Sequence, residues 1–135
     1  RAVGNRRMEA TGLDVVAGWA IDDGRADEAL AMLRQALRMH REMNLPEQML
    51  DGLSRMARAH AAADRHVISL RLLAAALALY ELMGLNVPGH VALRNERIVP
   101  TLRRVLDAEA FARISEEGRQ LNLEQAVDMA LAESG

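Results

Sequence analysis

Apolar residues recur three and four positions apart along nearly the whole chain, and no stretch alternates apolar and polar residues as a half-buried strand would. Glycine and proline interrupt this pattern between the apolar stretches. We therefore predict an all-α fold of about seven helices, preceded by a frayed or disordered segment over residues 1–7. The helices are expected over residues 8–23, 25–44, 47–63, 66–84, 91–106, 108–118 and 123–133.

Local signals refine two of these helices. Asn122, with Gln125 three residues later, forms a capping-box pattern ahead of the helix at 123–133. Pro100 lies inside the helix at 91–106. Because proline lacks a backbone amide and clashes with the preceding turn, we expect it to kink or break that helix.

The segment 67–85 reads VISLRLLAAALALYELMGL, and only Arg71 and Glu81 carry charge in it. A membrane-spanning helix needs about 20 apolar residues and is usually flanked by aromatic residues. Here both charges fall within the run, no aromatic belt flanks it, and no second such run exists. A helix that is apolar on two sides is also typical of the interior of a helical array, and we favour that interpretation.

Two segments forty residues apart share one arrangement of small and large residues. The matching pairs are Leu13 and Leu53, Ala17 and Ala57, Leu30 and Leu70, Leu33 and Leu73, and Leu37 and Leu77. A repeated helix–turn–helix unit is typical of stacked α-solenoids, and this one resembles tetratricopeptide (TPR) repeats with lengthened helices. We predict a single TPR-like domain over residues 8–135. Its repeat units are expected at about 8–44 and 47–84, with a helical C-terminal cap at 91–133.

In a TPR-like array, the first helix of each pair lines the concave inner face. That geometry predicts a binding surface on this face, for which Asp14, Asp51, Ser54 and Arg58 are the candidate residues. The remaining positions expected on the same face are Thr11, Gly18, Ile21 and Ala61.

Two stretches carry a sharper resemblance: RLLAAALALYELMGLNVP at 71–88 and AFARISEEGRQLNLEQAVDMALA at 110–132. Together they resemble the C-terminal end of the TPR-like region of large bacterial regulators. Those regulators join a STAND-type ATPase to a helical array, and carry a LuxR-type DNA-binding or adenylate-cyclase-type domain elsewhere. The chain departs from the pattern at Ser115, where the family usually has tryptophan, and at Ala74, where it commonly has glycine. The matching residues are Arg71, Leu72, Leu73, Gly84, Pro88, Phe111, Glu117, Gly118, Arg119, Leu121, Leu123, Glu124, Ala126, Val127, Ala130 and Leu131.

The resemblance implies a non-catalytic sensor or protein-interaction module that couples binding of an effector or partner to an output domain. Its partners would be other domains of the same polypeptide, together with a small-molecule effector or a protein. The alternative is a scaffold in which the exposed end of the array pairs two copies as a homodimer. The chain begins at Arg1 and contains no G-x-x-x-x-G-K-[ST] phosphate-binding loop, so we expect it to be part of a longer protein.

Composition further limits which ligands, compartments and activities we expect for this chain. The formal net charge is −2, and the only aromatic residues are Trp19, Tyr80 and Phe111. We therefore expect no direct nucleic-acid contact by this piece, since such surfaces are basic and rich in stacking side chains. The chain has no cysteine, which fits a reducing cytoplasm. No group has a plausible catalytic partner, so we predict neither enzymatic activity nor a cofactor.

Two other sets of residues have alternative interpretations. His60, Asp64 and His66 could form a metal cluster, but His60 fits a packed core histidine better. Several methionines cluster around the second and third helices. They either fill the core or form an adaptable binding groove, for which Met32 and Met39 are the candidates off the main apolar stripe.

Overall fold

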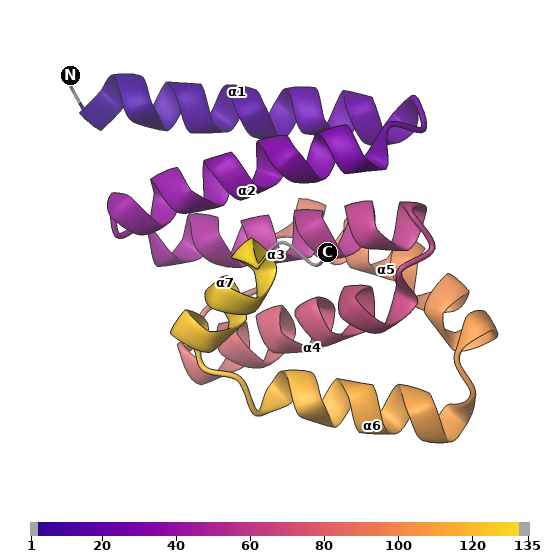
Figure 1. Cartoon of the computed structure of the whole chain (residues 1–135). Coiled ribbons are helices and arrows are strands. Elements are labelled where there is room, and N and C mark those ends of the chain that lie inside the picture. Colours follow the sequence, from indigo (N-terminus) through magenta and orange to yellow (C-terminus); the bar gives the residue numbers. More distant parts are fainter. Residues whose placement is uncertain (1–2, 133–135) are drawn as a thin grey trace.

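A computed structural model describes residues 3–132, which form seven α-helices and no strand. The predicted all-α fold is therefore confirmed. Helices α1, α2, α3, α4 and α6 lie in successive layers from the top to the bottom of Figure 1. There α5 crosses behind α3, and α7 lies in front of it. The helices are α1 (Val3–Asp22), α2 (Ala26–Glu42), α3 (Pro46–Ala62), α4 (His66–Leu82), α5 (Gly89–Val105), α6 (Ala108–Arg119) and α7 (Leu123–Leu131).

Two local predictions need correction. Helix α1 is already formed at Val3, so residues 3–7 are helical where the sequence predicted a frayed or disordered segment. An ion pair at 2.6 Å between Arg6 and Glu42 holds this first turn against the end of α2. Of the kink or break expected at Pro100, the break is wrong, since α5 continues to Val105. Pro100 is solvent-exposed, so water can solvate the carbonyl group that its missing amide leaves without a partner. Residues 1–2 of the predicted frayed segment lie outside the described range.

The turns between the first helices follow a twenty-residue register that the sequence pattern alone did not reveal. Each helix is followed by a residue with a left-handed backbone, a conformation that glycine, asparagine and aspartate tolerate best. The φ angles are 80° at Gly24, 55° at Asn44, 62° at Asp64 and 69° at Gly84. In each turn the next amide donates to a carbonyl five residues earlier, as in the Schellman motif. The bonds run from Arg25 to Ala20, Leu45 to His40, Arg65 to His60 and Leu85 to Tyr80, at 2.8–3.0 Å.

Helix α4 contains most of the apolar run at 67–85, and it lies between α3 and α6 (Figure 1). Leu72 and Leu73 are adjacent in sequence and therefore point to different sides of the helix, yet both are at most 1% exposed. The prediction that this run fills a core is thus confirmed. Among residues 3–132, no helix has the length and apolar character needed to span a bilayer.

The C-terminal helices close the array at α4. A Cβ atom on Gly118 of α6 would lie 2.4 Å from the carbonyl oxygen of Arg71 and 2.9 Å from the Cβ of Ala74. Only glycine therefore allows α6 to approach α4 this closely. The predicted capping box of α7 is confirmed, with Asn122 Oδ1 accepting from the Gln125 amide at 2.8 Å. From there α7 packs back onto α2, α3 and α4.

Helix α1 packs along α2, and α3 packs along α4, but the third pair does not repeat this geometry. Helix α5 lies against α3 and α4, whereas α6 packs mainly along α4 and only slightly against α5. The last helices thus cover the array instead of extending it. As a result, α1, α3 and α5 form one side of the molecule, and α7 lies across the other.

Candidate functional site

The four predicted site residues all lie where α1, α3 and α5 meet. Asp14 comes from α1, and Asp51, Ser54 and Arg58 come from α3. Ser54 is fully buried and Asp14 is 7% exposed, so these two do not form the open concave surface that the sequence predicted. The reason is α5, which packs against α3 and covers this part of the inner face.

Helix α5 contributes two polar side chains that the sequence analysis did not single out. The Arg94 guanidinium donates to Asp51 Oδ1 at 3.0 Å and to Ser54 Oγ at 3.1 Å. Ser54 Oγ in turn donates to Asn95 Oδ1 at 2.8 Å. The polar stripe of α3 therefore docks α5 through paired groups, which offset much of the cost of burying them, although Asn95 Nδ2 has no hydrogen-bond partner among the described residues. Their place in the sequence could have indicated this role, because Arg94 and Asn95 fall on the apolar side of the segment 91–106, where a buried polar contact is expected.

The pKa values of two carboxylates in this cluster are shifted in opposite directions because their surroundings differ. Burial raises the pKa of Asp14 to about 6, and the nearest cation, Arg55 Nε, is 3.9 Å away. Burial would also raise the pKa of Asp51, but hydrogen bonds and charge from Arg55 and Arg94 outweigh it and lower that pKa. Arg55 Nε lies 2.8 Å from Asp51 Oδ2. The cluster therefore joins α1 to α3 weakly, and α3 to α5 strongly.

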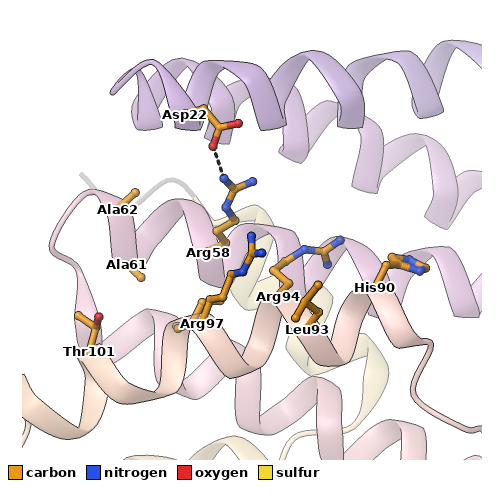
Figure 2. Close-up of a pocket in the computed structure, with 10 residues that line it drawn as sticks. Asp22, Arg58, Ala61, Ala62, His90, Leu93, Arg94, Arg97 and Thr101 are labelled. Carbon is orange, nitrogen blue, oxygen red and sulfur yellow. Dashed lines mark hydrogen bonds and ion pairs between the residues drawn. The ribbon is translucent and has the colours of Figure 1, made fainter.

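Beside this cluster an open pocket of about 550 Å³ lies between the end of α1, the end of α3 and the length of α5 (Figure 2). Arg58 spans the pocket from α3 and donates to Asp22, the last residue of α1. Apolar groups from α3 and α5 supply part of its wall, including Ala61, Leu93 and Ile98. Its polar lining consists of Asp22, Arg58, His90, Arg94, Arg97 and Thr101.

Arg97 is the least satisfied charge in this pocket. It is solvent-exposed, and no carboxylate among residues 3–132 forms an ion pair with it. In Figure 2 its side chain rises from α5 toward the same space as Arg58. The pocket and the adjoining cluster together hold four guanidinium groups, Arg55, Arg58, Arg94 and Arg97, against three carboxylates, Asp14, Asp22 and Asp51. The local charge is therefore positive, although the chain as a whole is slightly negative.

The alternative metal cluster does not form, and His60 is a core residue. His60 is 1% exposed, and its Nδ1 accepts from Arg65 Nε at 3.0 Å. Burial, with Arg65 and Arg34 nearby, lowers the pKa of His60 to about 4. The described residues contain no group of three or more histidine, cysteine or acidic side chains that could hold a metal ion.

The methionine alternatives are also settled by burial. Met39 is 6% exposed and packs in a small apolar cluster with Ala10 and Ala36. Met32 is partly buried against the main core. Both side chains therefore fill space between α2 and its neighbours, and neither forms an exposed binding groove.

Comparison with protein-family models, curated proteins and solved structures finds no match to this chain. The resemblance to the helical region of STAND-type regulators therefore remains a prediction from the residues quoted above. A proposal about function therefore rests mainly on the arrangement of α1, α3 and α5.

Proposed function

We propose that this chain is a non-catalytic sensor or protein-interaction module of a larger bacterial signalling ATPase or transcriptional regulator in the cytoplasm. Within it, a TPR-like helical array binds an effector or partner and transmits that event to an output domain. The single observation that carries the proposal is the pocket between α1, α3 and α5, where three helices from different parts of the array meet. The resemblance at residues 71–88 and 110–132 supplies the context.

The pocket can couple binding to the shape of the array because its walls are held together unequally. On one side, Arg94 connects α5 firmly to Asp51 and Ser54 of α3. On the other side, the end of α1 meets α3 through Arg58 and Asp22, and Asp22 remains largely exposed. A ligand that prefers one position of the α1 end will shift the population toward that position. The favoured mechanism is therefore a change in how α1 sits on the rest of the array.

Thermal stability in the presence of small metabolites tests this proposal. A ligand at a hundred times its Kd stabilises a one-site protein by about 2.7 kcal/mol, which a melting curve resolves. We expect at least one metabolite to raise the melting temperature. Ala62→Phe, at an exposed wall position, should abolish the rise, whereas Ala112→Phe, exposed on α6, should preserve it. A stabilising ligand that ignores Ala62→Phe would place the sensing site elsewhere, and a screen without any hit would contradict a small-molecule effector.

A second candidate function, a homodimer through α1, is favoured by the outer surface of that helix. Four apolar side chains lie exposed on it, with exposed fractions from 41% to 75%: Met8, Val15, Val16 and Trp19. No charged residue lies between these four side chains on that face of the helix, where Gly12 is also placed. In an antiparallel pair of α1 helices these apolar side chains would face their own counterparts, and Gly12, which has no neighbour within 4 Å, allows close approach. An uncharged apolar stripe along a single helix is self-complementary in an antiparallel pair, which favours a second copy as the occupant.

Trp19 is the only tryptophan in the chain, so its fluorescence reports on this surface directly. If two copies pair through α1, the emission should shift to shorter wavelength as the concentration rises, in step with the mass from light scattering. Val16→Asp should keep the protein monomeric, whereas Leu82→Asp, at an exposed position of α4, should not. A monomer at all concentrations, with unchanged emission, would exclude this function.

A further inference from the structure

The pocket between α1, α3 and α5 contains more positive charge than its own carboxylates neutralise. Asp22 accepts a hydrogen bond from Arg58, and Asp51 accepts hydrogen bonds from Arg55 and Arg94. Arg97 remains without an ion pair in the described part of the chain. A guanidinium group offers planar, paired donors that match a carboxylate or a phosphate group.

We propose that this pocket binds a small organic anion, with its carboxylate or phosphate group held between Arg97 and Arg58. The inference rests on the proposed sensing function and names the chemical class of its effector. A volume of about 550 Å³ falls within the usual range for small-molecule sites, about 300–1,000 Å³. It leaves room for an organic body behind the charged group.

The pocket wall fits the remainder of such a ligand. Leu93 is half-exposed on α5, and Ala61 and Ala62 face the pocket from α3. These groups offer apolar contact beside the two guanidinium groups. A fully polar ion such as inorganic phosphate makes no use of that wall. The ligand class that satisfies both parts is therefore an anion with an aliphatic or other apolar portion.

Binding of an anion also supplies a route for the signal. Arg58 donates to Asp22, the last residue of α1, and this carboxylate is 64% exposed. An incoming anion competes with Asp22 for the same guanidinium group. Its binding frees the end of α1 from α3, while Arg94 keeps α5 in place through Asp51 and Ser54. The chemistry of the pocket thus predicts which joint of the array moves.

Titrations with simple probes test the assignment. The probes are hexanoate, hexyl phosphate and the neutral hexanol, each followed by NMR of the arginine Nε–H signals on ¹⁵N-labelled protein. We expect hexanoate or hexyl phosphate to shift the signals of Arg97 and Arg58, and the stronger of the two identifies the anionic group. Hexanol should leave both signals in place. Inorganic phosphate should bind more weakly than hexyl phosphate, because it lacks apolar contact.

Matched variants complete the test. Arg97→Gln should weaken binding about tenfold, the loss expected for one charged hydrogen bond. Arg104→Gln is the control, since Arg104 is exposed on the same helix but does not line the pocket. Equal effects of the two variants, or shifts at Arg104 as large as at Arg97, would overturn the inference. So would a neutral metabolite whose stabilisation is lost in Ala62→Phe, and in that case the proposed sensing function would still stand.

Discussion

The pairs α1–α2 and α3–α4 have the same pattern of small and large residues, but they have different surroundings. Leu33 and Leu73 occupy equivalent positions, and both are almost fully buried. Val16 is 41% exposed, whereas its counterpart Met56 is fully buried. The reason is that α3 packs against α2 and α5 in addition to its pair partner α4, whereas α1 packs mainly against its pair partner α2 and only slightly against α3. The repeated pattern therefore specifies how two helices pair, while neighbours outside the pair decide which of its other faces are buried.

The largest effect is expected at the centre of the second pair. Leu73→Asp places a charge at a site that is 1% exposed between α3 and α6, which should cost about 5 kcal/mol and unfold the array. Leu77→Asp, one turn later on the same helix, is the control, since Leu77 is 39% exposed and should lose about 1 kcal/mol or less. Urea denaturation followed by helical circular dichroism measures both. A folded Leu73→Asp variant that loses only self-association would make α4 an interface instead of a core helix.

A smaller change in stability is expected at the outer surfaces of the two pairs. Helix α6 covers α4 of the second pair, whereas the outer surface of α1 in the first pair is exposed. Gly118→Ala would force its Cβ within 2.4 Å of the Arg71 carbonyl oxygen, so α6 must move away from α4, at a cost of about 3 kcal/mol. Gly12→Ala meets nothing within 4 Å on the outer side of α1 and should stabilise that helix by about 0.5–1 kcal/mol. Melting temperatures of the two variants should therefore shift in opposite directions. A destabilised Gly12→Ala variant would show that the α1 surface is already occupied.

The next comparison concerns two carboxylates, Asp14 on α1 of the first pair and Asp51 on α3 of the second. Since burial raises the pKa of folded Asp14 to about 6, its contribution to stability is complete below pH 4 and is lost as the pH rises through 6. The Asp14→Asn substitution removes this dependence, because an amide does not titrate. The stability of Asp14→Asn relative to the natural chain should therefore increase by about 2 kcal/mol between pH 4.5 and pH 7.5.

Asp51 provides the opposite control for that series. Its pKa is lowered in the folded state, so its contribution is present at neutral pH and is lost as the pH falls. The stability of Asp51→Asn relative to the natural chain should accordingly decrease toward neutral pH. Denaturation curves at several pH values measure both slopes. Equal slopes for the two variants would show that the two carboxylates share one environment, contrary to the geometry described.

Most of the fold follows from local pattern. The spacing of apolar residues predicts all seven helices, and the apolar faces of 67–85 predict the buried α4. The capping box at Asn122 and Gln125 is equally local, and it is present. These features depend on contacts within a helix or between sequence neighbours, which periodicity encodes directly. The start of α1 was missed because it depends on a distant contact, the pair between Arg6 and Glu42.

The candidate site was predictable only in part. The period of forty residues placed Asp14, Asp51, Ser54 and Arg58 on one side of the array, and the structure brings them to one region. What periodicity could not show is that α5 covers this region, since α5 departs from the repeat. Arg94 and Arg97 therefore escaped notice, although they complete the buried cluster and the pocket. Contacts between elements without a common pattern are the part that sequence reasoning cannot supply.

Amide hydrogen exchange, with and without the metabolite that raises the melting temperature most, shows whether a ligand binds between α1, α3 and α5. If a ligand binds between α1, α3 and α5, protection should increase in the parts of α3 and α5 that line the pocket, around Arg58 and Arg97. Exchange at the end of α1, near Asp22, should change as well, because that joint is the one a ligand would move. Protection confined to α6 and α7, or to the outer surface of α1, would contradict the account.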